Sequence, residues 1–162
     1  MVDEKLDYYE AKSWFWTRTF VWVVPAFIIT AIGQYFFWRY NALIGSASLK
    51  LWSSILGGVA SVLIGLLGAT LSLEFVWMRL GQRYGYVING PVCAIMSGIA
   101  AFLLCGAILS IMQNDPYNPM SQAEVQTTYM LMQFGIGASM FWGLIFGSWF
   151  AMRRDKYFIE QI

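Results

Sequence analysis

The sequence predicts an all-α integral membrane protein: a four-helix transmembrane bundle with a short N-terminal interfacial helix, forming a single membrane domain over residues 1–162. The first reason is composition, because 59% of the residues are hydrophobic and only 12% are charged, whereas soluble domains carry about a quarter charged residues. The second reason is four long apolar runs, each close to the roughly 20 residues that cross a bilayer as a helix. The third is the helical spacing of small residues within these runs, which suits helix packing in lipid.

The chain begins with a polar, acidic stretch, and we expect it to form an interfacial helix over residues 3–17. Acidic residues open the stretch, and Lys12 and Arg18 lie toward its end, as the helix macrodipole favours. An extended aromatic tail is the alternative. The stretch lacks the basic region and short apolar core of a signal peptide, so we expect the first span to remain in the mature protein.

Four predicted spans follow, joined by short polar or glycine-containing connections. Pro25 is expected to kink the first span. Gly85 and residues 89–91, which read Asn-Gly-Pro, are expected to break the chain before the third span. Ser121 and Glu124 have the spacing of a capping box and predict the start of the fourth helix. The four spans are predicted at residues 19–38, 51–76, 91–112 and 123–152.

A stripe of small residues, the small-residue seam, runs along the second span at alternating steps of four and three. In water this stripe would bury almost no apolar side chain. In lipid, small residues let two helix backbones approach closely and let hydroxyl groups bond across the contact. The seam therefore predicts a helix-packing face, and it consists of Ser54, Gly58, Ser61, Gly65, Gly68 and Ser72.

The fourth span carries a second stripe, the glycine ladder, at constant steps of four. This is the small-xxx-small pattern of closely crossing membrane helices. We expect the small-residue seam to pack inside the bundle and the face around Gly143 and Gly147 to meet a partner chain. The ladder consists of Gly135, Ser139, Gly143, Gly147 and Ala151.

The basic residues predict the orientation of the chain. Segment 153–156 holds three basic residues, whereas the connection at 113–124 holds none. We therefore expect both termini in the cytosol, that connection outside, and a location in the cell inner (cytoplasmic) membrane. The first connection, flanked by two basic residues, is the exception. Trp38 and Trp52 are expected at the outer interface.

The composition also excludes several classes of chemistry. The chain has no His, which argues against bis-His haem, His-ligated metals and a His general base. Cys93 and Cys105 lie about 18 Å apart along one helix, too far for a disulfide. A net charge of +1 without a basic cluster argues against nucleic acid. We expect no cofactor, no metal and no enzyme activity.

A few polar residues near or within the spans remain candidates for function. Glu74 and Arg79 lie near the expected cytosolic interface, and Glu74 is either an ion-coupling carboxylate or, as we favour, half of an interfacial salt bridge. Gln34 and Gln133 are expected near the outer ends of the first and fourth spans. They could line a pore, but bonding across helices is the commoner role of such residues.

The third span also spaces small residues at steps of four, three and four: Ala94, Gly98, Ala101 and Cys105. Three helices with such faces offer more packing surface than a four-helix bundle needs. We therefore expect a non-catalytic subunit that anchors or scaffolds a larger inner-membrane complex, with other integral membrane subunits and lipids as partners. The alternative is a homo-oligomeric channel or the small membrane subunit of a transporter. A subunit that contacts pigment or quinone ranks last, because the chain has no His to ligate a metal centre. No stretch of the sequence identifies a family.

Overall fold

The computed structural model contains three long helices: α1 (Val2–Asn41), α2 (Ala47–Gln113) and α3 (Gln122–Glu160). The structure describes the backbone of residues 2–41, 47–114, 116 and 120–160, and the side chains of residues 19, 21–40, 50–71, 88–114, 116 and 120–149. Within this part of the chain there is no strand. The prediction of an all-α fold is confirmed.

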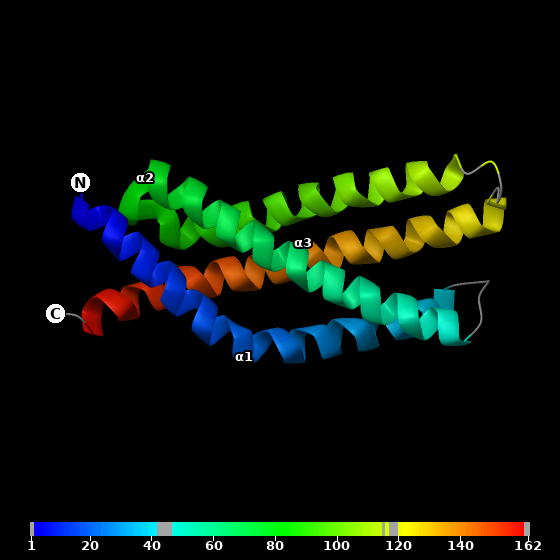
Figure 1. The fold of residues 1–162 in the computed structure, drawn as a ribbon, viewed down its shortest axis with the longest axis horizontal. Helices are drawn as coiled ribbons and strands as arrows, with labels where there is room; N and C mark the ends of the chain where they lie inside the picture. Colours follow the sequence, from blue (N-terminus) through cyan, green and yellow to red (C-terminus); the bar gives the residue numbers. More distant parts are fainter. Residues whose placement is uncertain (1, 42–46, 115, 117–119, 161–162) are drawn as a thin grey trace.

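Helix α2 folds back on itself, so the three helices form four antiparallel segments (Figure 1). The thiol of Cys93 lies 3.9 Å from the carbonyl oxygen of Gly65. In a straight helix these residues, 28 positions apart, would be separated by about 42 Å. The chain therefore reverses its direction between Gly65 and Cys93.

The break expected at residues 89–91 is wrong, because these residues lie inside α2 and Pro91 is part of the helix. Packing against α3 explains the difference. The side-chain amide of Asn89 donates to the carbonyl oxygen of Gly147 over 2.9 Å, and Gly90 is buried. These contacts outweigh the local preference of Asn-Gly-Pro for a turn, since a proline removes only one backbone donor.

Four segments are long and apolar enough to cross a membrane, and the chain is therefore a multi-pass membrane protein. We number them spans 1 to 4. Each overlaps a range predicted from the sequence. The spans are Val21–Tyr40, Lys50–Leu71, Ile88–Gln113 and Gln122–Trp149.

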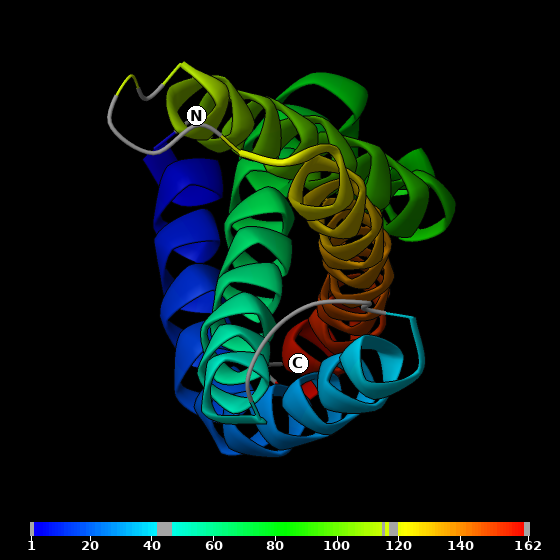
Figure 2. The ribbon, with the colours of Figure 1, turned by 90° about the vertical axis from the view of Figure 1, so that its right-hand side faces the viewer.

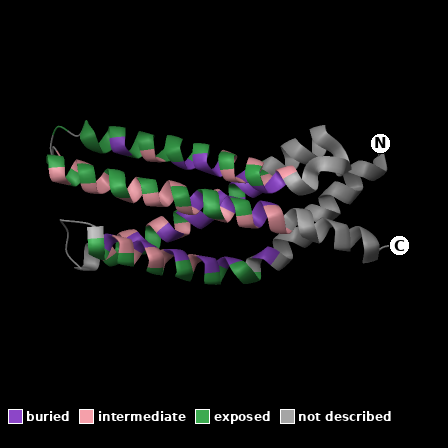
Figure 3. Ribbon diagram, turned by 180° about the vertical axis from the view of Figure 1, so that it is seen from behind, coloured by how far each residue is buried: buried purple, intermediate pink, exposed green. Residues whose placement is uncertain are grey.

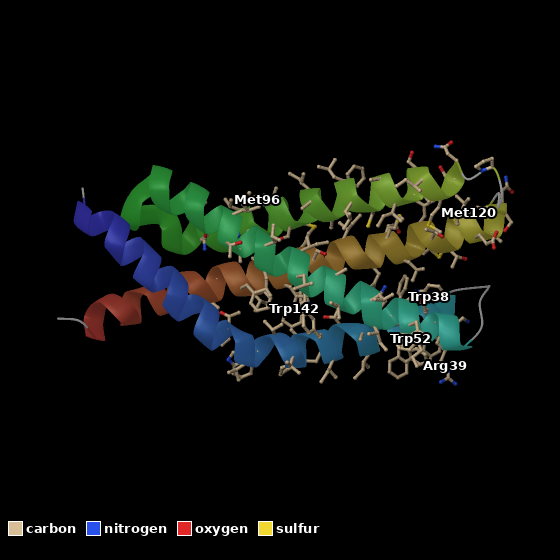
Figure 4. All side chains as sticks on the ribbon, in the orientation of Figure 1. Trp38, Arg39, Trp52, Met96, Met120 and Trp142 are labelled. Carbon is tan, nitrogen blue, oxygen red and sulfur yellow. The ribbon has the colours of Figure 1, made fainter. Side chains whose placement is uncertain are left out.

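The two ends of the bundle contain different parts of the chain. The N- and C-termini and the reversal of α2 lie at one end, and the α1–α2 and α2–α3 connections lie at the other (Figure 1). Figure 2 views the molecule from the end with the two connections and shows the helical segments grouped around a common interior. Trp38, Arg39 and Trp52 lie together at this end (Figure 4).

Helix α1 runs without interruption from Val2 to Asn41, so the predicted helix at 3–17 is continuous with span 1. The side chains of 3–17 lie outside those that the structure describes. The helix bends along its length (Figure 1). Pro25 lies inside it and accounts for a bend, because proline removes a backbone hydrogen bond and clashes with the preceding turn.

The core is a set of mostly small or aliphatic side chains from all four spans, with Phe146 as its largest member. Buried residues lie on the inward faces of the helices, whereas exposed residues dominate the stretch of span 3 that leads to its end at Gln113 (Figure 3). Many large apolar side chains point outward, as lipid contact requires. The core consists of Val23, Ala26, Val62, Leu66, Ala69, Cys93 and Phe146.

The predicted capping box opens α3 as expected. The backbone N–H and the hydroxyl group of Ser121 each donate to Glu124 Oε2 over 2.7 Å. The backbone N–H of Glu124 donates in return to Ser121 Oγ over 3.3 Å. This reciprocal pair satisfies donors that the first helical turn would otherwise leave unpaired.

Candidate functional site

The small-residue seam contacts each of the other three spans in turn. Gly58 faces span 1, Gly65 faces span 4 and Gly68 faces span 3. The approach is close, since a Cβ atom on Gly58 would lie 2.9 Å from the backbone nitrogen of Ala31. All described residues of the seam are buried, and the side chain of Ser72 lies outside the described set. The seam therefore holds the bundle together from within.

The glycine ladder is also used inside the chain, against span 3. Gly143 and Gly147 are buried. A Cβ atom on Gly143 would lie 2.9 Å from the carbonyl oxygen of Cys93, and one on Gly147 would lie 3.0 Å from that of Asn89. Our expectation that this face meets a partner chain is wrong, because span 3 already covers it. Ala151 lies outside the described side chains.

Three hydrogen bonds from nitrogen or oxygen donors join different spans and satisfy polar groups that lipid would leave unpaired. The hydroxyl group of Ser139 is also buried and donates to the carbonyl oxygen of Gly135 within α3. Hydrogen bonds of this kind stabilise a bundle of membrane helices. The cross-span bonds are Ser61 Oγ to Gly135 O at 3.3 Å, Asn89 Nδ2 to Gly147 O at 2.9 Å and Trp142 Nε1 to Thr30 Oγ1 at 2.6 Å.

Two buried side-chain polar atoms among the described residues have no hydrogen-bond partner, Gln34 Oε1 and Trp38 Nε1, and Gln34 is the one that lines a cavity. It is 5% exposed, and its Oε1 has no hydrogen-bond partner among the described residues. The amide lies against Gly57, where a Cβ atom would overlap it. Gly57 is seven residues from Lys50, where span 2 begins, and Gln34 is six residues from Tyr40, where span 1 ends, so Gln34 lies in the third of span 1 nearest the connections.

A cavity of about 540 Å³ opens beside Gln34. Spans 2, 3 and 4 form its walls with residues 53–64, 101–112 and 128–139 respectively, and Gln34 is the lining residue from span 1. Each of these ranges extends for about 16 Å along a helix. The cavity therefore reaches from the end with the two connections to the middle of the membrane. The sequence alone did not indicate it, because it arises where spans 2 and 3 move apart.

A second hollow, the α1–α3 groove, has a volume of about 460 Å³ and lies between spans 1 and 4. Small residues contribute to its lining: Gly33 is half-buried and Gly137 is exposed. A Cβ atom on Gly137 would meet nothing within 4 Å. Thr30 and Ala138 also line it, together with four large side chains: Ile29, Phe134, Phe141 and Trp142. The sequence did not indicate this groove, since neither glycine belongs to the small-residue seam or to the glycine ladder.

Gln133 lies one helical turn before Gly137 on α3 and is exposed. It has no hydrogen-bond partner within the described part of the chain. It lies two residues from Gly135, which accepts the bond from Ser61 at the middle of span 2. Gln133 is therefore well inside the apolar layer rather than near the outer end of span 4, which corrects our expectation.

The remaining candidate residues, Glu74 and Arg79, lie outside the side chains that the structure describes. Among the described residues, no group of three or more Cys, Asp or Glu side chains is placed to hold a metal ion. Both cysteines are free thiols; Cys93 is buried and Cys105 is half-buried on the wall of the cavity.

The geometry thus presents three features: a bundle closed by its small residues, a cavity with an unpaired amide and a surface groove with an exposed glycine. Comparisons of the chain with protein-family models, with curated proteins and with solved structures find no match.

Proposed function

We propose that this protein is a non-catalytic multi-pass subunit that anchors or scaffolds a larger inner-membrane complex, and that the α1–α3 groove receives a transmembrane helix of another integral membrane protein. The observation that carries the proposal is the small residue Gly137, exposed in this groove beside the unpaired amide of Gln133. Lipids cover the remaining apolar surface.

Small residues on the surface of a membrane helix favour another helix over lipid. Lipid tails solvate large apolar side chains well, so a glycine gains nothing from facing them, but it allows a second backbone to approach closely. The large side chains beside Gly137 give the groove walls into which the ridge of side chains on a partner helix can fit.

Gln133 also favours a partner helix at the α1–α3 groove. A carboxamide in the apolar layer without a hydrogen bond is unfavourable, and glutamine side chains commonly bond across membrane helices. Within the described part of the chain Gln133 has no partner. A helix seated in the α1–α3 groove would pass next to it and could supply one.

The alternative is a homo-oligomeric channel or transporter component, in which the helix seated in the groove belongs to a second copy and Gln133 lines the contact between copies. This alternative also uses the groove. The two proposals differ in the composition of the complex: a hetero-oligomer contains other membrane chains, whereas the alternative contains this chain alone.

The test is purification from native membranes in a mild detergent, followed by mass measurement of the intact complex. The wild type is compared with Gly137→Leu and with the matched control Gly106→Leu. Both glycines are exposed and a Cβ atom at either position meets nothing within 4 Å, so both variants should fold. We expect the wild type and Gly106→Leu to carry an additional integral membrane chain and Gly137→Leu to lose it.

A photo-crosslinking amino acid in place of Gln133 tests the same contact in intact membranes. We expect it to capture the same chain, and one in place of Leu103, which is 63% exposed on span 3, not to do so. A wild-type complex that contains only this chain would favour the channel alternative. A monomer without partners, or a Gly137→Leu variant that keeps its partner, would contradict the docking proposal.

A further inference from the structure

The cavity beside Gln34 has the dimensions of a site for one long, thin molecule. Its volume of about 540 Å³ falls within the usual range of roughly 300–1,000 Å³ for ligand sites. It extends for about 16 Å along the helices, since each of its walls covers 12 residues. Such a shape suits a single hydrocarbon chain better than a compact ring system.

The walls are largely apolar, and the cavity is open to the side. Room for the cavity comes from three small residues, Gly57, Ala60 and Ala101. Leucine, isoleucine and methionine side chains surround it. Leu56 on span 2 and Leu104 on span 3 line the cavity and are 66% and 47% exposed. The opening therefore lies between spans 2 and 3, where a molecule dissolved in the membrane can enter.

Most hydroxyl protons on the walls are already committed within the protein. Ser61 and Ser139 both donate to the carbonyl oxygen of Gly135, and Thr128 donates to the carbonyl oxygen of Glu124. The amide of Gln34 differs, because its Oε1 is buried without a donor. A buried polar atom without a partner is unfavourable, so a donor supplied by a ligand would stabilise this site.

The position of Gln34 along the length of the cavity determines the orientation of the bound ligand. Gln34 contacts Gly57, which is four residues, or about 6 Å, from the wall residue Ser53 at the connection end of span 2. Seven further residues, about 10 Å, separate Gly57 from Ile64 at the deep end. A chain that enters from the connection end would thus place its polar group near Gln34 and its tail toward the middle of the membrane.

We propose that this cavity binds a single-chain membrane amphiphile with a free hydroxyl group, of the monoacylglycerol type, and that the hydroxyl donates a hydrogen bond to the amide of Gln34. The hydrocarbon tail lies between spans 2, 3 and 4. This site is independent of the α1–α3 groove, and the docking proposal can fail without affecting it.

Alkylation of Cys105 by N-ethylmaleimide in phosphatidylcholine nanodiscs provides the measurement. Cys105 lines the cavity, whereas Cys93 is 0% exposed and serves as the internal control. The probes are 1-monomyristoylglycerol, which has hydroxyl groups, and methyl myristate, which has the same chain without a donor. We expect the hydroxyl compound to protect Cys105 at about tenfold lower concentration than the methyl ester, as one hydrogen bond to a buried amide allows.

Two variants distinguish the hydrogen bond to Gln34 from the filling of the cavity by the hydrocarbon chain. Gln34→Leu should remove the advantage of 1-monomyristoylglycerol over the methyl ester. Ala60→Phe should fill the cavity and abolish protection by both compounds, and its control Ala107→Phe changes an exposed alanine that does not line the cavity. Circular dichroism and thermal unfolding confirm that each variant folds. Because Ala60 is itself exposed, its replacement tests the site even if Gln34→Leu does not fold.

Three results would overturn the proposal. Equal protection of the wild type by both compounds would show that no donor is recognised. Unchanged protection in Gln34→Leu would exclude the amide as the contact. Protection of Cys105 by phosphatidylcholine alone, unaffected by either added compound, would show that an ordinary phospholipid tail fills the cavity.

Discussion

Gly143 on span 4 shows how little space the middle of the bundle leaves for a side chain. A Cβ atom there would lie 2.5 Å from Ser97 Oγ and 2.9 Å from the carbonyl oxygen of Cys93. The serine hydroxyl is itself bonded to the same carbonyl oxygen over 2.8 Å, so neither atom moves freely. Backbone contact of this kind is what small residues provide in membrane helices.

Gly143→Ala should therefore destabilise the protein, by about 1–3 kcal/mol, as overpacking of a close contact does. The control is Gly106→Ala, where the added Cβ atom meets nothing within 4 Å; its stability should stay the same or rise by up to about 1 kcal/mol, since alanine is the better helix former. Reversible unfolding in mixed detergent micelles measures both. Equal effects of the two substitutions would contradict the packing argument.

The bond between Trp142 and Thr30 links spans 4 and 1 at the residue scale. Trp142 Nε1 donates to Thr30 Oγ1 over 2.6 Å, and Thr30 donates in turn to the carbonyl oxygen of Ala26 over 2.7 Å. A double-mutant cycle with Thr30→Val and Trp142→Phe should give a coupling free energy of about 0.6 kcal/mol, and at most about 1.7, as such bonds do in membranes. Additive effects would mean that the bond contributes nothing to stability.

At the scale of the helices, local sequence features predicted some elements well and others poorly. The capping box at Ser121 and Glu124 depends on residues three positions apart, and it formed as predicted. The four apolar runs likewise depend only on the composition of each run. The Asn-Gly-Pro sequence at 89–91 failed because residues far away in the chain, on α3, hold it in a helix.

The same distinction applies to the candidate sites. Spacing identified the small residues of the seam and the ladder, but not which neighbour each of them faces. Gly143 packs on span 3, whereas Gly137, outside both stripes, is exposed. The cavity could not be predicted either, because it depends on how far spans 2 and 3 separate, which is a property of the whole bundle. Gln34 was the one useful sign, as a polar residue within an apolar run.

The bend of α1 leads to a prediction for the helix as a unit. Trp22, which precedes Pro25, makes an edge-to-face contact with Trp149 of α3, with ring centroids 5.5 Å apart. Pro25→Ala restores the missing backbone bond and should straighten α1, which moves Trp22 away from Trp149. With 5-fluorotryptophan and ¹⁹F NMR, the signals of both residues should shift while that of Trp52, at the other end, should not. Unchanged signals would contradict a bend caused by Pro25.

At the scale of the whole molecule, the even number of spans decides which parts of the chain share a side of the membrane. The termini and the reversal of α2 lie at one end, and the two connections lie at the other (Figure 1). The basic residues at 153–156 predict that the first end faces the cytosol, although Arg39 and Lys50, on either side of the first connection, oppose this orientation. The connection at 113–124 lies at the same end as the first connection, but it has no basic residue and does not oppose this orientation.

Labelling of single cysteines tests this orientation, on a background in which Cys93 and Cys105 are replaced by serine. Ser121→Cys changes an exposed residue beside the α2–α3 connection, and we expect a membrane-impermeant maleimide to label it in intact cells. A cysteine appended to either terminus should be labelled only after the cells are opened, because both termini lie at the opposite end of the bundle. Labelling of both termini and not of Ser121→Cys in intact cells would reverse the orientation, and labelling of one terminus alone would contradict the four-span fold itself.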